Sequence, residues 1–425
     1  MKNSKSISKS VAALTAALLG TTVTGASAQN HQETSILIYS EKNRIRATEG
    51  NFTLSKMLRN DYTLNLRLTY DGLTGATPTG ASPSKYAQTI TRASGGKTIS
   101  VPAGEHPVDN SFKDTRFAAE AGLSRPLGRL NTLSFGAHAS SEHDYTSLGI
   151  NGGIARDFNR RNTTIGLSLA IARDVSKPVG GYHEPFSDID AEIEDDRETR
   201  LERFSGKKRN VYDVIVSLTQ VMDRQTLLVL NLSLNRANGY LTDPYKIISV
   251  VQAPDGEDPG EPATSIFENR PDSRSKNAVF AELRRNLGRS TAGLQYRYFW
   301  DSWGVAAHSI DATMRFDFNK RGAIHPRVRW YHQSEADVYQ PFLVQGVPLP
   351  AYASSDSRLA AFDAYTFGMT YSVPVKNGSR LNLTAEYYAQ RGDSSPPEAY
   401  GSLLTFDLFP KLDVIMLRVG YERDY

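Results

Sequence analysis

The 425-residue chain contains no cysteine, and it has only three tryptophans and six methionines. Without cysteine, disulfide bonds and thiolate metal sites are excluded. After residue 28 the chain also lacks any apolar run that approaches the roughly 20 residues of a membrane-spanning helix. In lipid, only helices and closed barrels satisfy their backbone polar groups, so a membrane protein of this composition must be a β-barrel.

The first 28 residues have the pattern of a secretory signal. Three lysines precede a short apolar stretch at 11–19, and small residues at 26–28 form a cleavage site. The apolar stretch is too short to span a bilayer, and no stop-transfer pattern follows it. We therefore expect a cleaved signal peptide over 1–28 and an exported chain that begins at Gln29.

A surplus of charge of one sign is absent as well. The chain has 49 Lys and Arg against 46 Asp and Glu, and three of the lysines belong to the signal, so the exported part is formally neutral. That balance gives no electrostatic support for nucleic-acid binding. Aromatic residues, in contrast, are abundant, with 21 Tyr and 17 Phe.

Alternation of apolar and polar residues runs through most of the exported chain. In the hairpin at 211–235 every second residue of both arms is apolar, and a polar turn joins the arms. A tilted membrane strand needs about 9–11 residues to cross the hydrocarbon, and the segments are long enough. Fourteen strands are predicted, near 60–71, 114–126, 131–143, 146–158, 162–173, 211–222, 225–236, 276–287, 290–301, 305–318, 324–334, 360–373, 379–391 and 412–425.

The connections between these segments alternate between tight turns rich in Gly, Asn, Pro and Asp and mostly long polar loops. Outer-membrane barrels place short turns in the periplasm and long loops outside. The pattern predicts an all-β fold, a transmembrane antiparallel up-and-down barrel of about 14 strands with both termini in the periplasm. A barrel of 16 strands is the alternative, and a soluble β-sandwich or propeller would lack the outward rows of aromatic residues at 294–300 and 365–371.

Two further segments alternate but do not fit a count of fourteen. A single strand at 36–46 would reverse the direction of every later strand, so we expect residues 29–59 to form a periplasmic or lumenal segment that precedes a barrel over 60–425. The same argument places 400–410 as a cap over the outer mouth. At the other end, Gly420, Tyr421 and Tyr425 fit the signal that barrel assembly machinery reads in a last strand.

Inward positions of the predicted strands between 276 and 334 bring guanidinium and carboxylate groups onto one wall of the lumen. One interpretation is an arginine-biased constriction that favours anions, and the other is a structural ladder of ion pairs. The ladder comprises Glu282, Arg284, Arg297, Asp311, Arg315, Asp317, Arg327 and Arg329.

Two other groups of residues invite a chemical interpretation. The acidic loop with Asp188, Asp190, Glu192 and Glu194 offers oxygen ligands to Ca²⁺ or Mg²⁺, although it lacks the glycine of an EF-hand loop and equally suits a solvated acidic surface. His143-Asp144, at an outer strand end, could serve a hydrolase if a serine faced it. No flavin, haem or phosphate-binding motif is present, so no cofactor is predicted.

Several segments resemble one bacterial family of outer-membrane barrels, catalogued as domain of unknown function 3570. The matching segments are 39–45, 71–78, 161–164, 296–304 and 354–359. The family's genes often lie near a small lipoprotein, a thioredoxin-like protein and a flavin-attaching transferase. The resemblance therefore implies a partner in an envelope redox assembly, either a periplasmic redox protein or a lipoprotein, and it supplies no catalytic residues.

Together these features predict a non-enzymatic barrel in the outer membrane of a Gram-negative bacterium, in contact with lipid and lipopolysaccharide. Its leading role would be a pore or transporter, or a scaffold for an envelope assembly. The alternatives are a structural partner in an envelope redox complex and an integral outer-membrane hydrolase.

Overall fold

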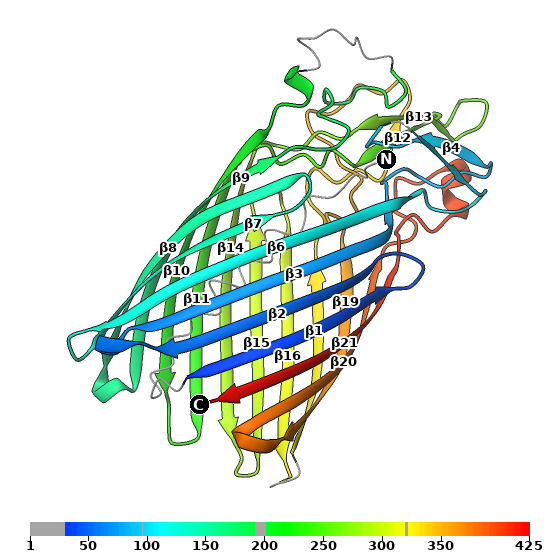
Figure 1. Cartoon of the computed structure of the whole chain (residues 1–425). Coiled ribbons are helices and arrows are strands. Elements are labelled where there is room, and N and C mark those ends of the chain that lie inside the picture. Colours follow the sequence, from blue (N-terminus) through cyan, green and yellow to red (C-terminus); the bar gives the residue numbers. More distant parts are fainter. Residues whose placement is uncertain (1–29, 96, 192–200, 319–321) are drawn as a thin grey trace.

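The computed structural model describes residues 30–95, 97–191, 201–318 and 322–425. Sixteen antiparallel strands form a closed barrel in which each strand is hydrogen-bonded to the next one along the chain (Figure 1). The barrel strands are β1 (His31–Glu41), β2 (Arg46–Met57), β3 (Thr63–Pro78), β6 (Val108–Leu127), β7 (Asn131–Ser141), β8 (Tyr145–Phe158), β9 (Thr163–Ser176), β10 (Lys207–Val221), β11 (Thr226–Gly239), β14 (Ser273–Asn286), β15 (Ser290–Asp301), β16 (Ala306–Asp317), β17 (Ala323–Gln333), β19 (Phe362–Pro374), β20 (Ser379–Gly392) and β21 (Leu412–Asp424).

The barrel closes between its first and last strands. β1 pairs with β21 along its whole length, from His31 opposite Asp424 to Glu41 opposite Val414. Because every strand then has two neighbours, the sheet has no free edge, which is the condition for a sheet to stand in lipid.

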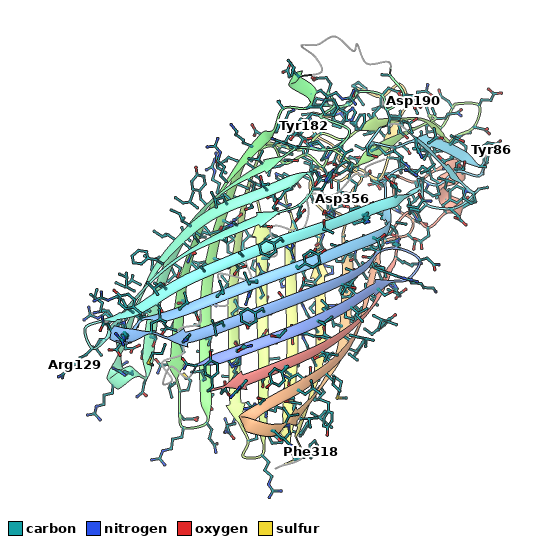
Figure 2. All side chains as sticks on the ribbon, viewed as in Figure 1. Tyr86, Arg129, Tyr182, Asp190, Phe318 and Asp356 are labelled. Atoms are coloured by element: carbon teal, nitrogen blue, oxygen red, sulfur yellow. The ribbon has the colours of Figure 1, made fainter. Side chains whose placement is uncertain are left out.

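The two ends of the barrel differ. At the turn end, where the C-terminus lies, the strands are joined by connections of three to five residues. At the loop end, five long connections gather, and they separate β3 from β6, β9 from β10, β11 from β14, β17 from β19 and β20 from β21. Figure 2 shows Arg129 and Phe318 at the turn end and Tyr182, Asp190 and Tyr86 at the loop end. The predicted alternation of short and long connections is confirmed.

The outer wall is apolar, as the alternation predicts. Of the predicted outward rows, Leu294, Phe367 and Met369 are each about half exposed. β-Branched and aromatic side chains favour such extended, one-sided surfaces. Exposed apolar rows on consecutive strands form a belt that suits lipid, so a soluble sandwich or propeller is excluded by the closed barrel and by this belt.

The predicted count of fourteen is wrong, and the alternative of sixteen is confirmed. All fourteen predicted strands are present. The two additional strands are β1 and β2, so most of the segment 29–59 is neither periplasmic nor lumenal but part of the barrel wall.

The error has a physical cause. The alternation over 36–46 predicts one strand, whereas the chain reverses at 42–45 around Asn43, whose φ is 56°. A hairpin adds two strands and leaves the direction of every later strand unchanged. Its second arm, β2, alternates weakly because Thr48 and Gly50 occupy outward positions where apolar residues are usual.

The loop end carries its own secondary structure. β12 (Ile247–Val251) lies between β13 (Pro262–Phe267) and β18 (Leu343–Val344) in a small sheet, and β4 (Gln88–Thr91) pairs with β5 (Thr98–Val101). The segment 400–410 contains a short 3-10 helix, η5 (Gly401–Thr405), and does not span, as predicted. Three other 3-10 turns among the described residues, η1 (Arg59–Asp61), η2 (Asn159–Arg161) and η4 (Lys376–Gly378), lie at the turn end. Among the described residues, no helix has the length and apolar character needed to cross a membrane.

Candidate functional site: a charged lumen under a folded cap

The predicted charge ladder lies on the inner face of β14 to β17. Strand register places its members on the side opposite the exposed apolar residues of the same strands. With Arg274, Lys276 and Asp301, this wall carries seven basic and four acidic inward side chains among the described residues. We call these four strands the basic wall.

Several ladder members form ion pairs, as the structural interpretation expects. Arg284 donates to Glu282 at 2.5 Å, and Arg315 lies 2.7 Å from Asp317 on the same strand. At the loop end of the wall, Arg274 binds the fully buried carboxylate of Asp301. These pairs neutralise most of the wall's carboxylates locally.

Arg327 binds two carboxylates, one more than each of the paired arginines above. Its guanidinium donates twice to Asp311, at 2.9 and 2.6 Å, and once to Glu386 of β20 at 3.0 Å. Asp311 stands directly opposite Arg329 in the strand register, yet its carboxylate binds Arg327. Arg327 therefore has two carboxylate partners on two strands.

Arg297 and Arg329 are different, because among the described residues neither has a carboxylate within 4 Å. Arg329 donates through Nε to the Ser309 hydroxyl at 3.1 Å, and Arg297 lies over the ring of Phe299. Both side chains are half-buried on the inner face of the barrel. The ladder therefore contains neutralised pairs and two uncompensated cations.

The wall across the lumen has the opposite sign. The described inward residues of β1, β2, β3 and β6 include six acidic side chains, Glu33, Glu41, Glu49, Asp71, Asp114 and Glu120, against two arginines, Arg67 and Arg116. Arg116 binds Asp71 at 2.6 Å. A basic wall that faces an acidic wall creates a field across the lumen, and a polar solute would cross that field.

Between these walls, β7 to β9 present small inward residues. Gly136, Gly149, Gly153 and Gly166 leave almost no room for a side chain, since a Cβ at Gly149 would lie 2.8 Å from the Ile171 carbonyl oxygen. Sequence reasoning missed this small-residue wall, although the recurrence of Gly and Ser at inward positions could have revealed it.

The long loops meet over the mouth of the barrel. The loop after β3, the loop after β11 and the loop after β17 all contact β12 or its direct neighbours. Thr79 accepts a backbone hydrogen bond from Ile247, Ser82 N–H donates to Ser249, and β18 pairs with β12. These loops leave the ring of sixteen strands at points separated by six, four and six strands. Loops from three such separated points meet at β12, which places β12 in the layer that the loops form at the mouth of the barrel.

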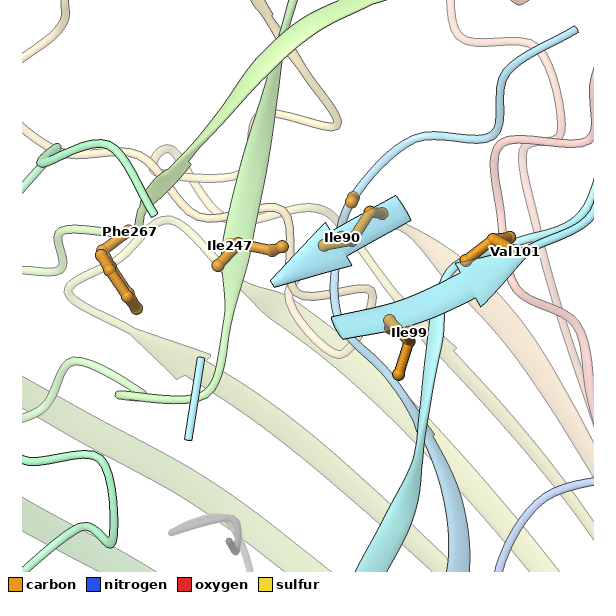
Figure 3. Close-up of a cluster of buried hydrophobic side chains, with 6 residues drawn as sticks. Ile90, Ile99, Val101, Ile247 and Phe267 are labelled. Carbon is orange, nitrogen blue, oxygen red and sulfur yellow. The ribbon is translucent and has the colours of Figure 1, made fainter. Parts of the chain in front are cut away.

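Hydrophobic clusters hold this cap together. Ile247, Ile248 and Val251 of β12 are fully buried, and Figure 3 shows Ile247 with Ile90, Ile99, Val101 and Phe267 from two different loops. A fourth loop joins through Leu403 of η5, which packs with Val251 and Phe342. Each fully buried aliphatic side chain contributes roughly 1.5–3 kcal/mol, so the cap has a core of its own.

A buried ionic network lies beside this core. Glu268 binds Arg270 at 2.6 Å, and Asp356 binds both Arg270, at 2.9 Å, and Arg358. Arg358 also reaches Asp243 at 2.8 Å. The network therefore ties the loop after β11 to the loop after β17 through the buried charges of Asp243, Glu268, Arg270 and Asp356, together with the partly exposed Arg358.

Burial and neighbouring charges shift the pKa values of the network's carboxylates in opposite directions. The guanidinium groups of Arg358 and Arg270 hold the pKa of Asp356 well below its usual range. Glu268 has a single arginine partner and is fully buried, so burial raises its pKa to about 7. Burial also lowers the pKa of Lys246, whose ammonium donates to the carbonyl of Pro78. Two small open recesses flank Lys246.

The chain matches the model of a known protein family. Residues 8–423 match the family model described as a protein of unknown function (DUF3570). The chain belongs to the DUF3570 family. The resemblance noted in the sequence is thereby confirmed, and a closed antiparallel barrel with an apolar belt indicates the outer membrane for this DUF3570 protein.

No curated protein matches the chain. Several solved structures are similar to the chain at low identity. The outer membrane protein OpdK from Pseudomonas aeruginosa is 11% identical over 94% of this chain and 99% of that chain, with a TM-score of 0.41. CdiB from Acinetobacter baumannii is 8% identical over 93% and 60%, with a TM-score of 0.45. A ferric enterobactin receptor from Pseudomonas aeruginosa is 12% identical over 86% and 54%, with a TM-score of 0.40, so the chain spans about half its length.

The acidic loop of this DUF3570 protein is partly described. Asp188 accepts hydrogen bonds from the Asp190 N–H and from the Thr264 hydroxyl at 2.5 Å, and Asp190 accepts one from Thr91 at 2.6 Å. Glu192 and Glu194 lie outside the described residues, as does the predicted signal at 1–28. Within the described ranges, no three His, Asp or Glu side chains gather as a metal site.

Asp144 and His183, both at the loop end, have structural surroundings. Asp144 accepts a hydrogen bond from the Tyr245 hydroxyl at 2.5 Å, so the carboxylate of the predicted His143-Asp144 pair ties an outer turn to the cap. His183 stacks on Phe267 at 3.7 Å, and burial lowers its pKa to about 4, which keeps it neutral.

The residues of the predicted insertion signal lie on β21 and just beyond it. Gly420 faces inward beside Glu33 and Ser35 of β1, where the barrel closes. Tyr421 and Tyr425 are about half exposed, and the Tyr421 hydroxyl bonds Ser379 at 2.7 Å. Their recognition by assembly machinery stays a prediction.

Proposed function

We propose that this protein is a non-enzymatic outer-membrane pore for small polar solutes, with the folded cap as its gate. One observation carries the proposal: a closed barrel of sixteen strands whose inner walls are charged and whose loop end is covered by a packed cap. A barrel of this size encloses a channel unless something fills it. We further propose that the chain reaches the membrane through a cleaved signal at 1–28.

The cap suits a gate because a small group of charged side chains joins two of its loops. The buried network around Asp356 joins two loops, and removal of one partner from a buried ion network typically costs about 3–5 kcal/mol. Such a loss would open the cap without touching the barrel wall, whose backbone hydrogen bonds do not involve these side chains.

Planar-bilayer recordings of the refolded, full-length exported chain test the proposal. We expect the wild-type protein to show small, brief conductance steps and Asp356→Ala to show larger and longer-lived openings. Asp255→Ala, in an exposed part of the same loop system, is the matched control and should behave as the wild type does. If the wild type and Asp356→Ala are both folded and both silent, the pore proposal is wrong.

A further inference from the structure

Two neighbouring arginines in the basic wall have no carboxylate within 4 Å in the part of the chain that the structure describes. Arg297 and Arg329 lie within electrostatic range of each other, and both lie within range of the Tyr331 side chain. In the register, Arg297 stands opposite Ser309, and Ser309 stands opposite Tyr331, two residues from Arg329. The two guanidinium groups therefore occupy adjacent levels on strands separated only by β16.

Among the described inward arginines of the basic wall, only these two have no carboxylate within 4 Å. The same wall supplies Glu282 to Arg284, Asp317 to Arg315 and Asp301 to Arg274. Arg327 receives two carboxylates, including Asp311, which stands opposite Arg329 in the register. A purely structural ladder would divide Asp311 and Glu386 between Arg327 and Arg329, because half-buried like charges repel each other.

The surrounding groups suit an anionic ligand. Ser309 already accepts the Nε proton of Arg329, so its own hydroxyl proton is available to an acceptor. Tyr331 and Tyr388 each donate their hydroxyl to a glutamine of their own strand, which leaves the arginines as the principal donors at this level. Guanidinium groups bind carboxylate and phosphate oxygens through paired hydrogen bonds.

We infer that Arg297 and Arg329, with Ser309, form a binding site for a small oxyanion, a carboxylate or a phosphate, on the lumen wall. The inference rests on the proposed pore function and names the class of solute that the pore would hold. Lys276, which also lacks a carboxylate within 4 Å among the described residues, lies nearer the loop end of the same wall, so the site continues a basic track from the mouth.

Isothermal titration of the refolded barrel in detergent tests the site without requiring conduction. Succinate and phosphate are the two probes, and choline is the cationic control. We expect saturable binding of at least one anion, weakened about tenfold or more in Arg297→Gln/Arg329→Gln, because charge-assisted hydrogen bonds are lost. Arg315→Gln removes an inward arginine that is paired with Asp317, and it should leave binding unchanged.

Folding of each variant is checked by its heat-dependent mobility on gels, and Arg297→Lys/Arg329→Lys serves as a second variant that keeps the charge. Lysine cannot offer paired donors, so binding should be intermediate. Tighter binding of succinate would assign carboxylates, and tighter binding of phosphate would assign phosphoryl groups. Absence of anion binding by the wild type, or equal binding by the folded glutamine variant, would overturn the inference.

Conductance measured on the same preparations separates the two proposals. A barrel that binds succinate through these arginines but never conducts would contradict the pore and retain the site. A barrel that conducts but binds neither anion would contradict the site and retain the pore.

Discussion

At the scale of single residues, charge placement distinguishes structure from function. Arg327 with its two carboxylates stabilises the wall, whereas Arg329, two residues away, carries an uncompensated charge. The sequence showed an inward face of alternating guanidinium and carboxylate groups but not which group binds which. Pairing depends on side-chain conformation across β16, β17 and β20, and strand alternation does not contain that information.

The cap offers a residue whose protonation changes with pH. Between the ordinary pKa of 4.5 and its value of about 7 in the cap, Glu268 binds more protons in the folded cap than in the opened one. Stability of the cap must therefore fall as pH rises through this window, by about 1–3 kcal/mol. Burial is the main cause of the raised pKa of Glu268; Asp243 and Asp356 add to the rise, and Arg270 opposes it.

Amide hydrogen exchange at β12, corrected for the intrinsic effect of pH, measures this dependence. The wild type should show faster opening of the cap at pH 8 than at pH 5. Glu268→Gln removes the titrating group. The difference in exchange rate between pH 5 and pH 8 should therefore shrink, even if the exchange rate itself changes at both pH values. An unchanged slope in Glu268→Gln would show that another group controls the cap.

At the scale of elements, the β1–β2 hairpin determines the number of strands in the barrel. Its first arm alternates clearly, with Ile36 and Ile38 outward, but its second arm has Thr48 and Gly50 at outward positions. The sequence pattern was therefore strong enough to suggest one strand and too weak to reveal two. Only pairing with β3 on one side and β21 on the other fixes these arms in the wall.

An arginine scan of β1 tests this placement. Ile38→Arg puts a charge on the lipid face and should cost about 2–4 kcal/mol if it lies near the bilayer centre. Leu37→Arg, one residue away, faces the lumen beside Glu49 and should cost much less. Urea titration of folding in lipid vesicles gives both values, and equal costs would contradict the position of β1 in the wall.

At the scale of the whole molecule, the cap joins loops from distant parts of the chain. Loops that start at three points around the ring share β12, and the segment 400–410 adds Leu403 to the same core. The sequence placed 400–410 over the mouth by strand direction alone. It could not show that the long loops pack on one another, because their apolar residues are scattered among polar ones.

A pair of glycine variants tests whether the cap opens as a unit. Gly80 has a φ of +100°, and a Cβ there would lie 2.6 Å from the Ile247 carbonyl oxygen. Gly95 has a φ of +78° with open space around it. Both alanine variants add backbone strain of roughly 1 kcal/mol, but only Gly80→Ala also displaces β12.

Amide hydrogen exchange across the loops measures the difference between the Gly80→Ala and Gly95→Ala variants. Gly80→Ala should raise exchange together in β12, β18 and η5, with the barrel strands unchanged. Gly95→Ala should affect the β4–β5 hairpin alone. Exchange that rises only next to residue 80 would show that the loops open independently.

The sequence by itself determined the barrel class, fourteen strand positions, the direction of each strand and the identity of the inward charges. These follow from a local period of two and from turn chemistry, which act between near neighbours in the chain. Tertiary structure decided the count of sixteen, the partner of each arginine and the packing of the cap, because each depends on contacts between residues far apart in sequence. For that reason the two arginines without counter-charges became visible only in the folded barrel.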